Sequence, residues 1–339
     1  MVRAGAEASG AGRSHCNGWT SSAGAYNRRV NATARQVFLS GLALAVAGSV
    51  MFSAKAIVVK LAYRHGVDAE TLLALRMLIA VPFFVVALWW TSRDAAPLSG
   101  RDHGLLLIIG LLGYYLASYF DFLGLQYISA ALERLILYLN PTLVLLLSVL
   151  VLRRPVTRFD LLALLLSYGG ILLVFWHDVR LEADGVLLGA ALVFGAAACY
   201  AVYLVLSGEL VRKVSAIRLT AYAMCVATVG VCVQFAALRP LASLAQPAPV
   251  LWLSLINAVL CTVLPVFATM MAVARIGAGS VALAGMIGPV STIALGYAFL
   301  GEPVSGSQLA GTTLVLAGVF VLSRKAGATS RSGRSTRRV

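Results

Sequence analysis

The sequence predicts an all-α integral membrane protein, with ten transmembrane helices arranged as two inverted five-helix repeats. Its 339 residues are 60% hydrophobic and only 12% charged, whereas soluble domains carry about 25% charged residues. Apolar runs of about 20 residues, the length that crosses a bilayer, recur between residues 37 and 323. Because these runs are continuous rather than alternating, they favour helices over a membrane barrel. The remaining observation is an internal duplication.

The duplicated unit is Tyr127–Val156, which is matched without a gap by Arg275–Val304, at an offset of 148 residues. Shared leucines are expected between any two apolar segments, but shared prolines are not. Each copy carries two prolines with the same spacing, Pro141 and Pro155 in the first and Pro289 and Pro303 in the second. The sequence therefore predicts a repeated structural unit.

The elements follow in chain order. Residues 1–35 are basic, rich in Gly, Ala and Ser and free of a long apolar run, so they predict a disordered cytoplasmic head. The first repeat covers 37–177, the second 185–323, and 324–339 form a basic cytoplasmic tail. The ten spans are expected at 37–60, 71–90, 104–124, 128–152, 159–177, 185–207, 216–238, 250–272, 279–300 and 306–323.

The distribution of Lys and Arg orients these spans. With the N-terminus inside, the inner segments hold 20 of these residues and the outer loops hold 3. Basic residues accumulate on the cytoplasmic side, so both termini are predicted inside, at the inner (plasma) membrane. The net charge of +14 then reflects topology and contacts with lipid headgroups rather than nucleic-acid binding.

Five spans per repeat is an odd number, so the two copies run in opposite directions through the membrane. Pro141 falls in a span that runs inward, and Pro289 falls in one that runs outward. Inverted repeats of this kind are typical of secondary transporters, which bind their solute at the interface between the repeats.

Short motifs point to a family. They are Gly48-Ser49 with Lys60, Leu75-Arg76-Met77, Asn140-Pro141 before a basic-Pro turn, and Gly288-Pro289 before Leu300-Gly301-Glu302-Pro303. Over residues 37–323 the chain resembles the EamA-type transporters of the drug/metabolite transporter superfamily. The resemblance implies ten helices in two five-helix units with both termini inside. Arg153-Arg154 departs from the Gly-Glu that usually precedes this proline in both units.

Five charged residues lie within the predicted spans: Lys55, Arg76, Asp121, Glu133 and Arg134. Each such charge costs ~2.5–3.5 kcal/mol near the bilayer centre on the insertion scale, so they need partners or water. By the helical rise, all five lie in the outer half of the membrane. The second repeat carries only Val281 and Ala282 at the positions of Glu133 and Arg134. We expect one charged layer; the alternative is a set of structural ion pairs or snorkelling ends.

Helical spacing adds polar neighbours to this layer. Glu133 shares a face with Asn140, Tyr138 lies beside Arg134, and Tyr114, Ser118 and Asp121 share a face of the third span. Pro141 and Pro289 free backbone carbonyls, which would serve a ligand or only kink the helix. For the tyrosines, packing is the simpler role. The candidate substrate or coupling-ion residues are Lys55, Arg76, Tyr114, Asp121, Glu133, Arg134, Tyr138 and Asn140.

Several chemistries find no support in the sequence. There is no phosphate-binding Walker A loop, so ATP is not expected as the energy source. The five cysteines lack metal or disulfide spacing, and His65, His103 and His177 lie in loops or at span ends, away from any catalytic cluster. We therefore expect no cofactor, no metal and no enzymatic activity.

The predicted function is secondary active transport of a small organic metabolite by alternating access, coupled to protons or another cation at Glu133 and Asp121. The summed charge of the layer, +1, weakly favours an anionic or zwitterionic solute. The alternatives are an uncoupled exchanger or facilitator and, less favoured, an intramembrane enzyme of lipid metabolism. Further expectations are contacts with membrane lipids, a homodimer or internal packing through Gly185-x-x-x-Gly189, a wet turn at Glu302 and an interfacial Lys60.

Overall fold

The computed structural model describes residues 16–93, 95, 97–152, 157–181, 185–211 and 213–335, and the side chains discussed below lie between residues 36 and 321. The helices, in chain order, are α1 (Cys16–Tyr63), α2 (Ala69–Ser92), α3 (Gly100–Gly110), the π-helix η1 (Leu111–Leu116), α4 (Ala117–Gly124), α5 (Ala130–Leu137), α6 (Asn140–Leu152), α7 (Arg158–Leu181), α8 (Val186–Leu210), α9 (Ala216–Leu238), the 3-10 helix η2 (Leu241–Leu244), α10 (Ala248–Ala258), the π-helix η3 (Val259–Val263), α11 (Leu264–Gly285), α12 (Ile287–Leu295), the π-helix η4 (Gly296–Leu300) and α13 (Gly306–Ser335).

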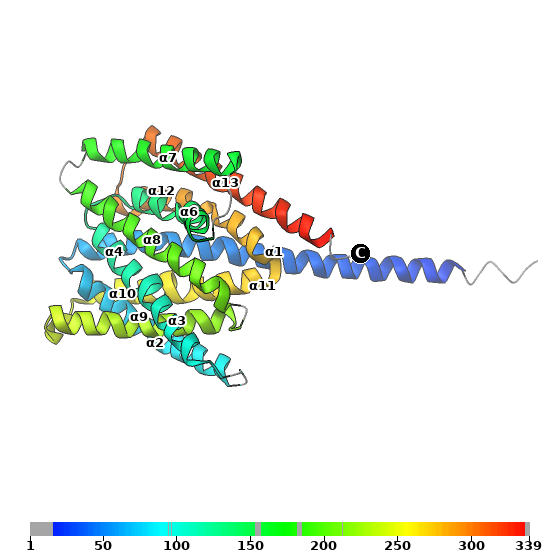
Figure 1. Ribbon diagram of the computed structural model, residues 1–339, viewed down its shortest axis with the longest axis horizontal. Coiled ribbons are helices and arrows are strands. Elements are labelled where there is room, and N and C mark those ends of the chain that lie inside the picture. The colour runs from blue at the N-terminus through cyan, green and yellow to red at the C-terminus, as the bar shows by residue number, and fades with distance from the viewer. Residues whose placement is uncertain are drawn as a thin grey trace, which may run out of the picture.

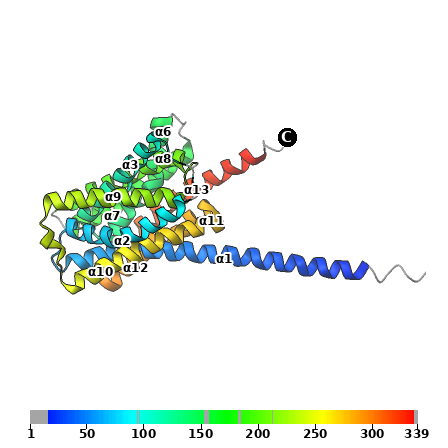
Figure 2. The same ribbon diagram turned by 90° about the horizontal axis from the view of Figure 1, so that it is seen from below.

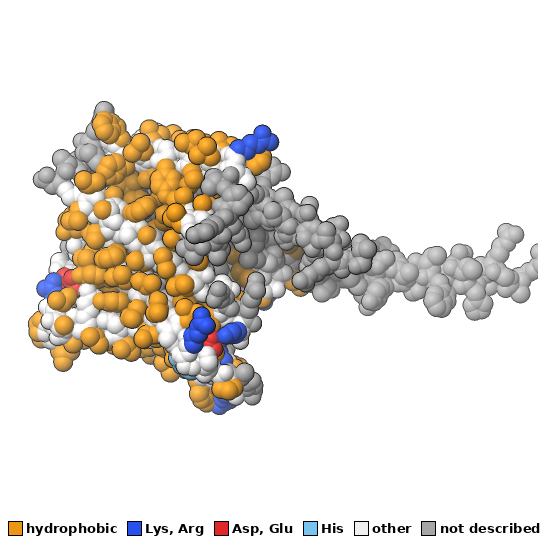
Figure 3. All heavy atoms as spheres, viewed as in Figure 1, with side chains coloured by type: hydrophobic (Ala, Val, Ile, Leu, Met, Phe, Trp, Pro, Cys, Tyr) orange, Lys and Arg blue, Asp and Glu red, His pale blue; other side chains and the backbone are white. Residues whose placement is uncertain are grey.

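Within the described residues, nine helical segments are long and apolar enough to cross a membrane, and a shorter apolar stretch, Gly306–Val321, follows them. The predicted all-helical membrane protein is confirmed, and this shorter stretch corresponds to the tenth predicted span. Several large apolar side chains on the outer faces are exposed, among them Trp90, Leu150 and Leu187 at 71–75%. The space-filling view shows apolar side chains over most of the face drawn and charged ones only near its edges (Figure 3), as a lipid-facing surface requires.

The head differs from the prediction. Residues 16–35 were expected to be disordered, yet the backbone from Cys16 onward is helical and continuous with the first span. Residues 1–15 lie outside the described part of the chain. The physical reason is that extending an existing helix avoids the cost of nucleating a new one. The beginning of α1 projects beyond the bundle on the same side as the end of α13 (Figures 1 and 2).

The helices of the two repeats pair with one another instead of forming two separate bodies. Contacts join α1 to α11, α2 to α9, α4 to α8, α12 to α5, and α13 to α7. In terms of spans, these pairs are 1 with 8, 2 with 7, 3 with 6, 4 with 9 and 5 with 10. An exchange of the two repeats maps this set of pairs onto itself, which is what a two-fold relation between inverted repeats produces.

The structure extends the duplication beyond the segment in which the sequence reveals it. The π-helical turns η1 and η3 begin at Leu111 and Val259, 148 residues apart, within the third span of each repeat. Such π-helical turns are rare in proteins and often lie at functional sites. Their equivalent positions show that the third spans belong to the repeat.

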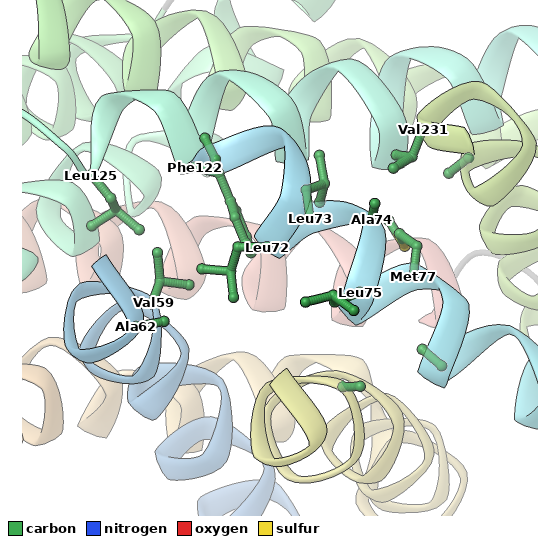
Figure 4. Close-up of a cluster of buried hydrophobic side chains, with 14 of the residues drawn as sticks. Val59, Ala62, Leu72, Leu73, Ala74, Leu75, Met77, Phe122, Leu125 and Val231 are labelled. Carbon is green, nitrogen blue, oxygen red and sulfur yellow. The ribbon is translucent and has the colours of Figure 1, made fainter. Parts of the chain in front are cut away.

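The largest buried cluster holds α2 against its neighbours (Figure 4). Leu72, Leu73 and Met77 of α2 meet Phe122 of α4 and Val59 of α1, each no more than 1% exposed. Because lipid tails are as apolar as these side chains, close van der Waals packing is what holds such helices together in a bilayer. This core fixes the position of α2, the helix that carries Arg76.

Candidate functional site

A central cavity of about 290 Å³ lies between the two repeats. Both repeats contribute side chains to its wall. Seven of the eight candidate residues line it: Lys55, Arg76, Tyr114, Asp121, Arg134, Tyr138 and Asn140. The eighth, Glu133, lies behind the wall and is 0% exposed. The charged layer expected from the sequence is thus brought together around one cavity.

The second-repeat wall was not anticipated, although the duplication locates it. The lining residues form pairs at the same offset of 148: Phe52 with Tyr200, Arg76 with Met224, Gly113 with Cys261, Tyr114 with Thr262, and Ser118 with Val266. Applying the offset to each candidate position would have found Met224 and Thr262. The cavity therefore lies where the two repeats face each other at equivalent positions.

Lys55 gathers both carboxylates of the site. Its ammonium group donates to Asp121 of α4 in a hydrogen-bonded ion pair and lies 2.9 Å from Oε1 of Glu133 on α5. The side chain of Glu133 is 1% exposed and that of Lys55 is 13% exposed. Glu133 thus pairs with α1, not with its neighbour in sequence, Arg134. One cation therefore faces two carboxylates, and the three groups carry a net charge of −1 when all are ionised.

The two arginines have no carboxylate partner within the described residues. Nη2 of Arg76 donates to Oγ of Ser118 at 2.9 Å, and its guanidinium lies 4.8 Å from the centroid of the Phe122 ring. The guanidinium of Arg134 lies 5.3 Å from the ring centroid of Tyr138. In both arginines Nε is buried without a hydrogen-bond partner in the part of the chain that the structure describes. A buried donor without a partner is unfavourable, and an anionic ligand would satisfy it.

The side chain of Asn140 satisfies the carbonyl group that Pro141 leaves without a helical hydrogen-bond donor. The fourth span is interrupted after Leu137, and α6 begins at Asn140, directly before Pro141. Proline cannot donate to the carbonyl four residues earlier, and that carbonyl, of Leu137, accepts from the side-chain amide of Asn140 at 2.7 Å. This carbonyl is therefore not left for a ligand, and the amide nitrogen of Asn140 serves the backbone. Its Oδ1 is buried and has no hydrogen-bond partner among the residues described.

At the second proline, Pro289, two hydroxyl groups of the first repeat satisfy the corresponding carbonyl group. The carbonyl four residues before Pro289 is that of Gly285. It accepts hydrogen bonds from the hydroxyl of Tyr138 and, at 3.2 Å, from that of Ser49. Tyr138 was expected at the ligand site; it lines the cavity, but its hydroxyl is used to join the repeats.

Tyr114 belongs to an aromatic cluster. Its ring centroid lies 5.2 Å from that of Tyr203 and 6.4 Å from that of Tyr200, in edge-to-face orientation. The Tyr114 and Tyr203 hydroxyl oxygens are 3.4 Å apart. Such pairs stabilise packing, which agrees with the packing role considered for the tyrosines. Only Tyr114 and Tyr200 of the three also line the cavity.

The turn at Glu302 is exposed, as predicted, but its carboxylate is engaged. Gly301, Pro303 and Val304 are exposed, whereas the Glu302 side chain is 19% exposed and its Oε1 lies 3.0 Å from Nζ of Lys60. It also accepts from the backbone N–H of Ala130 at 3.3 Å, while Lys60 donates to the carbonyl of Ile128 at 2.9 Å. Lys60 is therefore a link between the repeats and not merely an interfacial residue. The sequence cannot reveal this link because it depends on the turn folding over the end of α1.

Further polar contacts join the repeats at both ends of the bundle. At the end that includes Lys60, Arg239 lies 3.5 Å from Asp68 and 3.3 Å from Glu70. At the opposite end, Nζ of Lys213 lies 3.0 Å from Asp102, and Arg218 donates to Ser92 at 3.1 Å. Polar contacts between the repeats are thus present at both ends of the helix bundle.

The glycine pair predicted as a helix contact is used within the chain. A side chain at Gly189 would clash with Tyr127 and Ile128, and one at Gly185 would clash with Tyr127. The homodimer stays a prediction. Among the described residues, no group of three or more His, Cys, Asp or Glu side chains is arranged to hold a metal ion.

Comparison with known proteins agrees with this architecture. The model of the EamA-like transporter family matches residues 39–176 and 187–324, two segments whose ends are again 148 residues apart. Two proteins of Bacillus subtilis (strain 168) are similar. "Uncharacterized transporter YcbK" is 32% identical over 282 residues, covering 80% of this chain and 89% of that protein. "Uncharacterized transporter YyaM" is 26% identical over 220 residues, covering 64% and 72%.

A solved structure titled "Crystal structure of protein" shares the fold. It aligns with a TM-score of 0.60 at 17% sequence identity, covering 85% of this chain and 98% of that one. The family match spans both repeats and the whole charged site. This chain therefore belongs to the EamA-like transporter family, within the drug/metabolite transporter superfamily.

Proposed function

We propose that this transporter is a secondary active carrier that moves a small organic solute through the central cavity by alternating access, coupled to protons. Transport itself follows from the family. The coupling, and the assignment of the ion to Lys55, Asp121 and Glu133, are the proposal. In the same proposal both termini face the cytoplasm at the inner (plasma) membrane, as the distribution of Lys and Arg favours.

The observation that carries the proposal is the pair of carboxylates on one ammonium. Glu133 is buried, and its carboxylate and that of Asp121 share Lys55. Two carboxylates held close together in a poorly solvated site are a common device for binding a proton, because one proton relieves their repulsion. A solute bound in the adjacent cavity would lie close to this proton site, because Lys55 and Asp121 line the cavity.

Alternating access is supported by the contacts between the repeats at both ends. An opening toward the Lys60 end would separate Lys60 from Glu302 and Arg239 from Glu70. An opening at the other end would separate Lys213 from Asp102. Carriers built from inverted repeats exchange two such states by moving one set of helices against the other.

The experiment uses the full chain in proteoliposomes loaded with a pH-sensitive dye. A panel of small organic solutes is added one at a time, with and without an imposed pH gradient. We expect at least one solute to move protons in wild type. Glu133→Gln keeps the shape of the side chain and removes its titration, so it should abolish uphill transport while leaving solute counterflow partly intact.

The matched control is Asp160→Asn, which changes a buried carboxylate that lies outside the cavity. If the wild type carries a solute but responds to neither a pH gradient nor a sodium gradient, ion coupling is wrong. An uncoupled exchanger or facilitator would then be the function. If a sodium gradient alone drives transport, the coupling ion is sodium and not the proton.

A further inference from the structure

The chemical class of the solute follows from how the charges of the cavity are divided. Lys55 is engaged by Asp121 and Glu133, so these three groups leave no positive charge free and sum to −1 when all are ionised. Arg76 and Arg134 face the same cavity and have no carboxylate partner among the described residues. Two guanidinium groups with unsatisfied buried donors are matched by an acceptor group that carries negative charge.

We infer that the solute is a singly charged organic anion, with its acid group at Arg76 and Arg134 and an apolar body against the second-repeat wall. This inference rests on the proposed function, because it names what the carrier would move. With both carboxylates ionised, three cations face two anions, and the remaining charge of +1 is balanced by one anionic group. A carboxylate is the simplest such group, and guanidinium is well suited to bind it.

The body of the solute follows from the other wall. Tyr200, Met224 and Val266 of the second repeat line the cavity without a formal charge, and Phe52 of the first repeat lies in the same cavity wall. The cavity volume of about 290 Å³ lies near the lower limit for small-molecule sites, which are about 300–1,000 Å³. A compact acid with an aliphatic or aromatic body therefore fits better than a large or multiply charged one. The flexible side chain of Met224 suits an apolar body of variable shape.

A cationic solute fits this arrangement less well. The carboxylates that would receive an ammonium group are already bound to Lys55, so the solute would have to displace an ion pair in a low-dielectric site. A zwitterion brings no net charge, so it leaves the excess of +1 uncompensated. The unpartnered oxygens of Asp121 and Asn140 remain available for a hydroxyl or N–H group on the solute.

The same charge balance determines the sign of coupling. The charged groups around Glu133 are Lys55 on α1, Asp121 on α4 and Arg134 on its own helix, and Arg76 on α2 lies near Asp121. A proton bound at this cluster raises the positive charge of the cavity and strengthens anion binding. Coupling between two ligands is reciprocal, so the anion also favours the proton, and the two are carried in the same direction.

The test compares four probes with the same six-carbon body: hexanoate, hexanamide, hexylamine and norleucine. Thermal unfolding of the full-length protein in detergent reports binding of each, independently of whether any solute is transported. We expect hexanoate to raise the unfolding temperature most. Arg76→Gln with Arg134→Gln should weaken its apparent Kd at least tenfold, whereas the exposed control Arg158→Gln should leave it unchanged.

A second part of the test measures the apparent Kd of hexanoate at mildly acidic and at mildly alkaline pH. Both pH values lie above the range in which hexanoate itself is protonated. Binding should be tighter at the acidic pH in wild type, and Glu133→Gln should reduce this difference. Three results would overturn the inference: tighter binding of hexylamine or norleucine, hexanoate binding that survives the double arginine variant, or no shift with hexanoate at all. A carrier that binds hexanoate without pH-driven flux would contradict the proposed coupling but not the anion class.

Discussion

The two repeats share a framework and differ in the chemistry placed on it. Their helices, their proline breaks and the π-helical turns η1 and η3 correspond at one offset, and equivalent positions line one cavity. The charges do not correspond. In the first repeat the five charged positions are Lys55, Arg76, Asp121, Glu133 and Arg134, and their equivalents in the second are Tyr203, Met224, Thr269, Val281 and Ala282. A symmetrical scaffold thus carries an asymmetrical site.

This difference teaches that the conformational framework and the ligand chemistry are separable. An inverted repeat needs both copies for alternating access, because each copy occupies in one state the place that the other occupies in the opposite state. Ligand recognition needs only one charged wall. Concentrating the charges in one copy avoids burying a second set, each member of which would cost ~2.5–3.5 kcal/mol near the bilayer centre.

The largest test concerns the inversion itself. Reporter fusions after Val179 should report the outside of the membrane, and fusions after Val214 and Arg324 should report the inside. These outcomes are all-or-none, since a span either crosses or does not. A fusion at Arg324 that reports the outside would leave an odd number of crossings, and the two repeats could not then be related by an inverted five-plus-five arrangement.

The next test breaks the charge asymmetry at its centre. Lys55→Met leaves two buried carboxylates without their cation, and removing one partner of a buried ion pair costs about 3–5 kcal/mol. We expect a large drop in the thermal unfolding temperature in detergent. At the equivalent position, Tyr203→Phe removes one hydroxyl from a long contact and should change it little.

A neutral replacement sharpens this result. Adding Asp121→Asn and Glu133→Gln to Lys55→Met removes the charges together, so most of the lost stability should return while proton coupling stays absent. If the triple variant does not regain thermal stability, Lys55 acts through packing and not through its charge. If Lys55→Met and Tyr203→Phe lower the unfolding temperature equally, the two repeats do not differ energetically at this position.

The sequence alone predicts the framework and the charged wall, for physical reasons. Ionisable groups stand out in apolar helices, so Lys55, Arg76 and Asp121 are found without a structure. Met224 and Thr262 do not stand out, because such side chains are ordinary in a membrane span, and only the repeat offset from Arg76 and Tyr114 locates them. The partner of Glu302 depends on a tertiary contact between residues far apart in the sequence, and no local pattern encodes it.

The third test compares two adjacent glycines in α7. A side chain at Gly170 would lie 2.5 Å from the carbonyl oxygen of Gly311 in α13, whereas one at Gly169 meets none of the described residues within 4 Å. Gly170→Ala must therefore separate the symmetric pair α7 and α13, at a cost of about 1–3 kcal/mol typical of overpacking. Gly169→Ala should be neutral or slightly stabilising, because alanine favours helix. Thermal unfolding of the two variants side by side is the measurement, and equal effects would show that α7 and α13 do not depend on this close approach.

The smallest effect is expected at the link between Lys60 and Glu302, where the repeats again differ. Arg154 stands at the position equivalent to Glu302, so this acidic link cannot be reproduced by the first repeat. Both side chains are partly exposed, at 23% and 19%, and exposed ion pairs contribute about 0.2–1 kcal/mol. A double-mutant cycle of Lys60→Met and Glu302→Gln should give a coupling energy in this range by thermal unfolding.

The same variants should favour opening at the Lys60 end of the bundle. Ser118→Cys places a thiol in the cavity wall, and this thiol should then react faster with a membrane-impermeant thiol reagent added from that side. The parent for this measurement carries Cys261→Ala, which removes the cysteine already lining the cavity. A coupling energy of zero together with unchanged labelling would show that this contact holds neither the fold nor one of its states.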